Sequence, residues 1–216
     1  MDEKTLKQTI SKLKESKKRN FKQTIDLIIN LKNLDLKKPE HQVEFFLELP
    51  AFKGKKSKVC ALIGPELADL AKKTMDNSVV ISDFENYQKN KKLSKKLASD
   101  YDFFVAQANI MPKIATAFGR VFGPKGKMPN PKAGCIVPPN ANLENVYNKL
   151  QKTVKVSGKK TALVQNIVGN QESSDEDVSE NVKYIYNNLV HHLPQGVNNI
   201  KSIYLKYTMG KPIKVM

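Results

Sequence analysis

The residues best suited to bind a ligand form a basic run around one aromatic side chain. The run KKRNFK spans residues 17–22 and places Phe21 between Arg19 and Lys22. Phe21 could stack on a nucleotide or a ribose while its basic neighbours hold phosphate oxygens. It could equally be a hydrophobic staple or a core residue, and the pattern alone does not separate the two.

A second candidate lies near the C-terminus, where Ser202, Tyr204, Lys206 and Thr208 alternate with three apolar residues. This period of two predicts a strand that exposes the four side chains on one face. Small hydroxyls beside a lysine suit contacts to phosphate and 2′-hydroxyl groups. Such residues are also common on an ordinary strand surface, so both interpretations stay open.

Residue types that catalyse reactions are present without the necessary spacing. The segment GPKGKMP is not a phosphate loop, because Val121 and Met128 stand where that motif needs Gly and Ser or Thr. His191 and His192 are adjacent in a predicted helix, where neighbouring side chains point apart. No Cys/His cluster in the sequence has zinc spacing. The sequence therefore predicts no enzyme, no metal and no cofactor.

The charge of the chain indicates a polyanionic partner. Its 216 residues carry 37 Lys and Arg against 21 Asp and Glu, a net charge of +16. Arg19 and Arg120 are the only arginines. Because lysine acts on phosphate as a point charge, this composition favours contacts to a nucleic-acid backbone over the reading of bases. A lysine-rich composition also arises from AT-rich coding sequence or from thermophily.

Hydrophobicity and cysteine content bear on the compartment. Apolar runs are all shorter than the roughly 20 residues that span a membrane, and the N-terminal segment lacks the apolar core of a secretory signal. Cys60 and Cys135 are far apart in the sequence and form no disulfide pattern. We therefore expect a cytoplasmic protein with no membrane partner.

The two ends of the chain share one pattern of apolar residues. They combine amphipathic helices with alternating strands, which is typical of a two-layer α+β unit. The predicted helices cover 4–18 and a stripe over 178–193, and the predicted strands cover 25–31, 42–49, two segments within 153–168, and 203–207. The lysine-rich tract 53–58 is predicted to be a solvated linker. The acidic segment 172–177 is predicted to cap the second helix and to face away from a polyanion.

The middle of the chain instead predicts a parallel sheet. Short apolar runs at 59–63, 79–81 and 103–106 alternate with predicted helices, as in βαβ units. We therefore expect a discontinuous domain of residues 1–57 and 152–216, with an α/β domain of residues 58–151 inserted in it. Two linkers would then cross between the domains, an arrangement that permits a hinge.

Three segments of the sequence resemble a known family. They are residues 19–50, FGRVFGPKGKMPNP at 118–131, and SIYLKYTMG at 202–210. In this order they are similar to the large-subunit ribosomal protein one family, the protein of the ribosome's mobile lateral stalk, in its archaeal form. The resemblance implies a split α-β plait domain built from both chain ends, with an inserted three-layer Rossmann-like α/β domain. Residues 133–136 depart from the family pattern, so the geometry of that tip is not implied.

The resemblance also implies a function. Family members bind a structured site on large-subunit ribosomal RNA and lie near the exit site for deacylated tRNA. Several also repress translation by binding their own messenger RNA. The implied RNA-contacting positions are Phe21, Thr24, Ser202, Thr208, Met209 and Gly210, to which we add the basic residues Arg19, Lys22 and Lys206. A secondary contact to RNA or tRNA is expected at Arg120, Gly123, Lys125 and Lys127, and the free protein is expected to be a monomer.

Two other classes of protein stay open. A nucleotide-dependent enzyme acting on RNA would use the predicted parallel sheet. It needs a glycine-rich phosphate turn directly after a strand, and Gly64-Pro65 is a poor one. A generic lysine-rich nucleic-acid chaperone would bind duplex DNA and stalk RNA with equal affinity at moderate salt.

Overall fold

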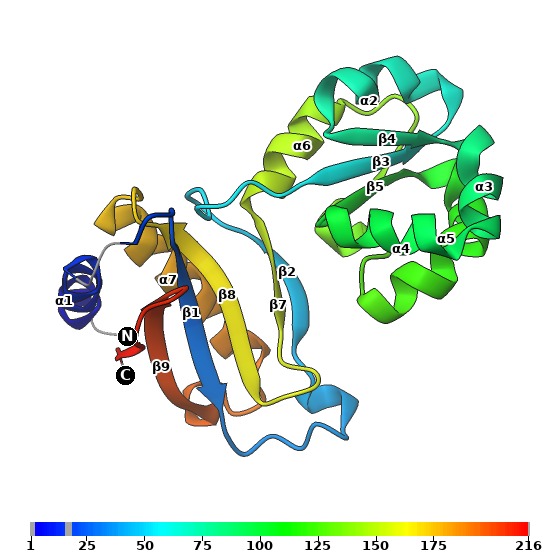
Figure 1. Ribbon diagram of the computed structural model, residues 1–216. Helices are drawn as coiled ribbons and strands as arrows, with labels where there is room; N and C mark the ends of the chain where they lie inside the picture. The colour runs from blue at the N-terminus through cyan, green and yellow to red at the C-terminus, as the bar shows by residue number, and fades with distance from the viewer. Residues whose placement is uncertain (1–2, 16–18, 216) are drawn as a thin grey trace. The chain divides into compact units, whose positions relative to one another are not determined.

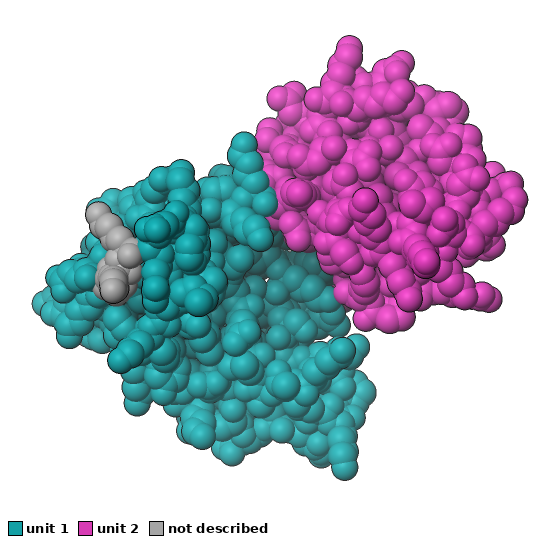
Figure 2. All heavy atoms as spheres, in the orientation of Figure 1, with its two compact units in different colours: residues 1–56, 152–216 teal, residues 57–151 magenta. Residues whose placement is uncertain are grey.

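The computed structural model describes residues 3–15 and 19–215, and the chain forms two compact units (Figure 2). The terminal unit runs up to Lys56 and resumes at Lys152, and the inserted unit is Ser57–Gln151. The sequence-based division places Ser57 with the chain ends, whereas in the structure Ser57 groups with the inserted unit. The Gln151 side chain accounts for this, because its Oε1 accepts the Ser57 N–H and its Nε2 donates to Ser57 O, both at 2.9 Å.

The terminal unit is an antiparallel sheet with two helices packed on one of its faces (Figure 1). The strand order is β10-β9-β1-β8, and β2 pairs with β7 in a separate two-stranded ladder. The elements are α1 (Glu3–Lys14), β1 (Thr24–Leu31), β2 (Glu44–Glu48), β7 (Thr153–Ser157), β8 (Leu163–Asn170), α7 (Asp175–His192), β9 (Ile200–Tyr207) and β10 (Ile213–Lys214), with 3-10 turns at Pro39–His41 and Gly196–Asn199.

Side-chain periodicity decides which face of this sheet is buried. Every second residue of β1, from Ile25 to Leu31, is buried, and the residues between them are half-buried. The apolar stripe of α7 is buried in the same core, as its helical period predicts. Ser174 begins α7, because its hydroxyl accepts the Asp177 N–H at 3.0 Å.

The inserted unit is a parallel sheet of order β4-β3-β5-β6. Within this unit, β3 comes first along the chain and lies between β4 and β5, which come second and third. This is the arrangement of a doubly wound α/β fold. Its elements are β3 (Val59–Ile63), α2 (Ala68–Thr74), β4 (Asn77–Val80), α3 (Phe84–Lys89), α4 (Lys91–Asp100), β5 (Phe103–Gln107), α5 (Met111–Lys125), β6 (Ile136–Val137) and α6 (Leu143–Lys152), with 3-10 turns at Pro65–Leu67, Ile81–Asp83, Ala108–Ile110 and Pro131–Ala133. All five residues of β3 are buried, as expected for a central strand.

An aromatic cluster fixes α5 against this sheet. Phe118 and Phe122 of α5 are fully buried, and their ring centroids lie 5.0 Å apart. Phe122 lies 4.3 Å from Phe104 of β5, and Phe118 meets Phe84 of α3 edge-on at 5.3 Å. These contacts position the C-terminal turn of α5, where the segment GPKGK lies.

A side chain fills the place where doubly wound sheets bind ligands. That place lies beyond the carboxyl ends of β3 and β5, next to Gly64. Gln107 is buried there, accepts the Gly64 N–H at 2.9 Å, and donates to the Glu66 carboxylate at 3.2 Å. A Cβ on Gly64 would lie 3.0 Å from Gln107 Oε1. This packing argues against a phosphate-cradling turn and so against a nucleotide-dependent enzyme.

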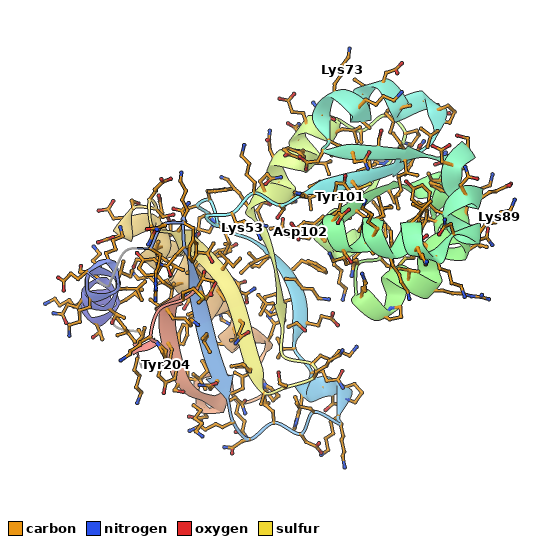
Figure 3. The ribbon with its side chains drawn as sticks, in the orientation of Figure 1. Lys53, Lys73, Lys89, Tyr101, Asp102 and Tyr204 are labelled. Atoms are coloured by element: carbon orange, nitrogen blue, oxygen red, sulfur yellow. The ribbon has the colours of Figure 1, made fainter. Side chains whose placement is uncertain are left out.

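The tract 53–58 is only in part the solvated linker that its composition predicts, because Lys55, Lys56 and Lys58 are exposed but the start of the tract is packed. Lys53, labelled in Figure 3, is only 7% exposed, and its ammonium donates to Thr153 O at 2.8 Å. The next residue, Gly54, has a φ of +91°, and its carbonyl accepts from Asn170 Nδ2 at 3.0 Å. The first linker is therefore attached to β7 and to the end of β8.

Candidate nucleic-acid interface

Two threonine hydroxyls meet where β1 begins and β9 ends. Thr24 and Thr208 are 184 positions apart in the chain, and their Oγ1 atoms lie 2.9 Å from each other. Thr208 N donates to Thr24 O at 3.1 Å, so the backbone ladder fixes the pair. Thr208 is exposed and Thr24 half-buried. Since each hydroxyl has one donor and two acceptor positions, the pair keeps hydrogen-bonding capacity for a ligand.

Two large apolar side chains lie exposed beside this pair in the chain. Phe21 is 51% exposed and Met209 is 63% exposed. Phe21 is therefore not a core residue, and this alternative from the sequence is excluded. We call the group of Thr24, Thr208, Met209 and the nearby residue in the chain, Phe21, the threonine edge.

A buried amide that the sequence did not single out holds the threonine edge in place. Gln23 is 2% exposed, and its Oε1 accepts the Met209 N–H at 3.2 Å. Its backbone carbonyl accepts the Gln171 N–H at 3.2 Å. A glutamine just before a strand carries no signal in the sequence, because its burial depends on segments far along the chain.

Gly210 forms the tight turn that ends β9. Its N–H donates to Tyr207 O at 2.8 Å, and a Cβ at this position would lie 3.2 Å from the Tyr207 Cβ. The missing side chain therefore lets the backbone turn sharply directly after Met209. Gly210 therefore lies next to the threonine edge, and its implied contact to RNA stays a prediction.

The acidic segment 172–177 does not face away from the predicted RNA-binding residues. Lys22 Nζ lies 2.8 Å from the Glu172 carboxylate, and Lys14 forms an ion pair with Asp175. The expectation was wrong because β8 and the following turn bring the start of α7 to the end of the sheet where β1 begins. Both partners of the Lys22–Glu172 pair are largely exposed, so a phosphate can displace Glu172 at little cost.

Ser202 lies apart from the threonine edge and is not exposed as the strand pattern predicts. It is 7% exposed, and its hydroxyl accepts from Asn30 Nδ2 at 2.9 Å across the β1–β9 ladder. Six residues of extended strand, about 20 Å, separate it from Thr208. The burial arises because the Asn30 side chain binds its hydroxyl. The structure thus brings together Thr24, Thr208, Met209 and Gly210, with Phe21 three positions before Thr24 in the chain, but not Ser202.

Asp26 and Lys206 are cross-strand neighbours on the sheet face that bears no helix. Thr24 Oγ1 donates to Asp26 Oδ1 at 3.4 Å. Burial raises the pKa of Asp26, and the Thr24 hydrogen bond and the Lys206 charge oppose that rise. Asp26 and Lys206 also border a hollow of about 320 Å³ on this face. The Asp26 carboxylate therefore partly neutralises the positive charge of Lys206.

Replacing Asp26 with asparagine should stabilise the chain, and more so at higher pH. Because the pKa of Asp26 is raised above 3.8, the folded chain binds this proton more tightly than the unfolded chain does. As the pH rises above 3.8, Asp26 ionises less readily in the folded chain than in the unfolded chain, so the free energy of unfolding of the unchanged chain falls. The Asp26→Asn variant has no carboxyl group here and does not show this fall. Urea denaturation of both chains from about pH 3 to 7 measures the difference. A difference in free energy of unfolding that shrinks with rising pH would contradict the sign.

The segment GPKGK is the last turn of α5 rather than a phosphate loop. Gly126 ends the helix in the left-handed region, with φ +63°. Lys125 Nζ donates to Ser99 Oγ at 2.7 Å, and Lys127 Nζ donates at 2.6 Å to the carbonyl of Tyr101, which Figure 3 labels. Burial lowers the pKa of the Lys127 ammonium. Both lysines therefore bind protein oxygens at a helix end whose dipole is itself negative.

Catalytic and metal chemistry find no support in the part of the chain that is described. Within residues 3–15 and 19–215, no three His, Cys, Asp or Glu side chains are grouped as metal ligands would be. In the same ranges, no helix is long and apolar enough to cross a membrane. Burial raises the pKa of the Cys60 thiol to about 12 and that of Cys135 to about 11, so neither forms a reactive thiolate at neutral pH. Lys17 and Lys18 of the basic run lie outside the described residues.

Comparison with known proteins agrees with this fold. The model of the Ribosomal protein L1p/L10e family matches residues 13–211. Large ribosomal subunit protein uL1 of Nanoarchaeum equitans is 42% identical over 211 residues, which cover 96% of this chain and 97% of the relative. The uL1 proteins of Methanothermococcus thermolithotrophicus and Methanothermobacter thermautotrophicus are each 40% identical, over 93% and 97% of this chain and 92% and 97% of their own lengths. These archaeal relatives match both units, and the predicted resemblance is confirmed. The chain belongs to the ribosomal protein L1p/L10e family.

Proposed function

We propose that this protein binds large-subunit ribosomal RNA at the lateral stalk, and that the threonine edge is the centre of the contact. The observation that carries the proposal is the hydroxyl pair of Thr24 and Thr208, flanked along the chain by two exposed apolar side chains, Phe21 and Met209. Exposed apolar side chains beside paired hydroxyls suit a ligand with both flat rings and sugar hydroxyls. RNA has both.

Family membership sets the wider role of the protein. It is a structural protein of the large ribosomal subunit and not an enzyme. We propose two further roles for the protein. On the ribosome it assists the release of deacylated tRNA from the exit site, and off the ribosome it represses translation of its own messenger RNA. The messenger would have to present the same shape to the threonine edge as the ribosomal RNA does.

The uncharged residues and the lysines contribute to binding in different ways. Thr24 and Thr208 can bind 2′-hydroxyl and phosphate oxygens, Phe21 can stack on a base or a ribose, and Met209 can pack on a sugar. Lysines such as Lys206 and Lys22 add attraction that weakens with salt. Selectivity for a structured RNA over duplex DNA therefore depends on the threonine edge rather than on the net charge. A generic lysine-rich chaperone would show no such selectivity.

The secondary contact at the end of α5 stays a prediction. Lys125 and Lys127 would have to leave their protein acceptors to bind RNA, whereas Arg120 is exposed one turn earlier. A contact to RNA or tRNA there would depend mainly on Arg120, with Gly123 allowing close approach of the backbone.

Replacing Thr208 with valine should weaken binding to the stalk ribosomal RNA by about 1–3 kcal/mol, or about 5- to 150-fold. The change removes the exposed hydroxyl and keeps the shape of the side chain. Fluorescence anisotropy with a labelled stalk RNA fragment measures the affinity, and a thermal melt measures stability. Thr161→Val is the matched control, because Thr161 is exposed in the loop before β8, at the far end of the sheet. Its affinity should stay within about twofold of that of the unchanged chain.

The opposite pattern would contradict the proposal. If Thr208→Val retains full RNA affinity while the melting temperature falls, the threonine pair only ties β1 to β9. Equal affinity of the unchanged chain for duplex DNA and stalk RNA at moderate salt would favour the generic chaperone.

A further inference from the structure

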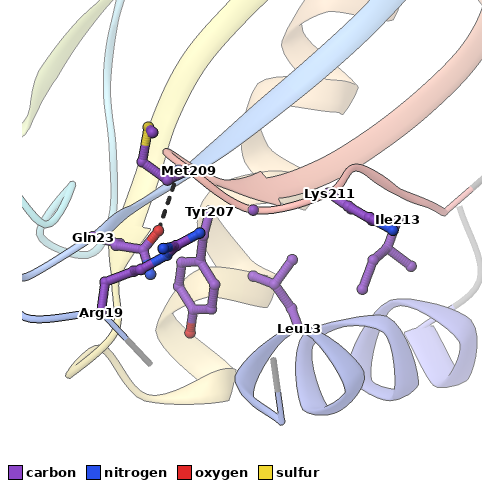
Figure 4. Close-up of a pocket in the computed structure, with 8 residues that line it drawn as sticks. Leu13, Arg19, Gln23, Tyr207, Met209, Lys211 and Ile213 are labelled. Atoms are coloured by element: carbon purple, nitrogen blue, oxygen red, sulfur yellow. Dashed lines mark hydrogen bonds between the residues drawn. The ribbon is translucent and has the colours of Figure 1, made fainter. Parts of the chain in front are cut away.

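A hollow of about 370 Å³ opens directly beside the threonine edge (Figure 4). It lies between the end of α1, the turn after β9, and β10. Its volume is within the range of about 300–1,000 Å³ that small-ligand pockets have. Its lining includes Met209, which is part of the threonine edge. A ligand that crosses the threonine edge therefore reaches the mouth of this hollow.

The inner wall of the hollow is apolar. Leu13 of α1 and Tyr207 of β9 are buried, and Ile213 of β10 is half-buried beside them (Figure 4). Burial raises the pKa of the Tyr207 hydroxyl, and the nearby Asp175 raises it further. Lys14 pairs with Asp175, which offsets that negative charge. The wall is thus uncharged, and Ile213 is the side chain of the three that a flat ring can reach, with Leu13 and Tyr207 buried behind it.

Two cations line the same hollow. Arg19 and Lys211 are both exposed, and Figure 4 shows Arg19 close to Gln23 and Tyr207, with Lys211 on the other side of the hollow. A guanidinium can bind two phosphate oxygens at once, and a lysine ammonium adds a point charge. A hollow with an apolar wall and cationic sides fits a group that is flat at one end and anionic at the other.

We propose that this hollow receives one unpaired nucleotide of the bound RNA. Its base lies against Ile213, over the buried Leu13 and Tyr207, and its phosphate lies between Arg19 and Lys211. The inference rests on the proposed RNA-binding function and adds a site for a single extruded base. A base inside a duplex cannot enter, so the protein would bind an RNA with an unpaired nucleotide at this position in preference to a continuous helix.

The test fills the hollow and removes the base in the same experiment. The probe is the labelled stalk RNA fragment, either intact or with an abasic site at each of its unpaired positions in turn. Ile213→Trp puts an indole into the hollow. Val197→Trp is the matched control, because Val197 is exposed in the same unit and does not line the hollow. Anisotropy titrations give the affinity of each protein variant for each RNA.

We expect one abasic position to weaken binding by the unchanged chain about tenfold, and Ile213→Trp to weaken binding of intact RNA by a similar factor. The two changes should not add, since both remove the same contact. Val197→Trp should bind as the unchanged chain does. Full affinity of Ile213→Trp for intact RNA, no sensitive abasic position, or additive losses would each overturn the proposal.

A second measurement covers a variant that does not fold. RNA carrying 4-thiouridine at the unpaired positions is irradiated with the unchanged chain, and the crosslinked peptides are identified by mass spectrometry. Crosslinks to Tyr207 or Ile213 support the proposal, and crosslinks that fall elsewhere on the chain overturn it. Failure of the unchanged chain to bind the RNA at all would overturn the proposed function as well. Loss of binding in Thr208→Val with none in Ile213→Trp overturns only the nucleotide site.

Discussion

Replacing Gly54 with alanine should lower the free energy of unfolding of the terminal unit by about 2–5 kcal/mol. The φ of Gly54 is +91°, a conformation that costs an L-residue about 1–2 kcal/mol. A Cβ there would lie 2.3 Å from the Gly169 carbonyl carbon and 2.6 Å from Asn170 N. These are backbone atoms at the end of β8, so the linker itself has to move away. Loss of the Asn170–Gly54 hydrogen bond would follow.

Gly158→Ala is the matched control for this variant. Gly158 lies in the same unit, its φ is not in the left-handed region, and its added Cβ would meet Leu31 and Val164 side chains at an ordinary 3.5 Å. Its free energy of unfolding should change by less than about 0.5 kcal/mol. Denaturant titrations of the unchanged chain, Gly54→Ala and Gly158→Ala measure the three free energies of unfolding. A Gly54→Ala chain as stable as the control would mean that the first linker is free of β8.

The elements of the fold could be predicted from the sequence because burial imposes local periods. Alternation marked β1, a continuous apolar run marked β3, and the stripe of α7 marked its buried face. These patterns need only neighbouring residues. The parallel sheet and the two-layer unit followed from the same patterns, and the fold class is confirmed.

Contacts between distant segments could not be predicted in this way. The sequence around Lys53 predicts a solvated lysine, but in the fold its ammonium binds the Thr153 carbonyl of β7. The strand pattern predicts an exposed Ser202, but in the fold its hydroxyl binds the Asn30 side chain. Gln23 becomes important only because the turn after β9 brings Met209 N within reach. The family resemblance supplied the positions of the candidate site, and the structure supplied its geometry.

Some of the 37 Lys and Arg residues are engaged within the protein, and the net charge of +16 already counts each Lys–Glu pair as neutral. Lys22 is paired with Glu172, Lys155 with Glu44, and Lys127 binds a backbone carbonyl. The exposed Lys22 pair is opened at little cost, whereas Lys155 and Lys127, which are less exposed, would lose a protein partner on binding a phosphate. The proposed function therefore predicts that uncharged groups, rather than lysines, distinguish one RNA from another.

The double variant Phe21→Ala/Met209→Ala tests that conclusion most directly. Stacking of one base on an aromatic ring contributes about 1–3 kcal/mol, and packing of a half-exposed methionine on a ribose adds about 1 kcal/mol. The expected loss of affinity for stalk RNA is therefore about 30- to 1,000-fold. Because both side chains are more than half exposed, the free energy of unfolding should stay nearly unchanged.

The salt dependence of binding separates this effect from a change in electrostatics. No charge is removed, so the slope of log affinity against log salt should be the same for the variant and the unchanged chain. Leu70→Ala/Leu93→Ala is the matched control, since it removes two exposed apolar side chains from the inserted unit. It should leave both affinity and slope unaltered. If instead Phe21→Ala/Met209→Ala bound as tightly as the control, lysines alone would account for the affinity, and the threonine edge would not select the RNA.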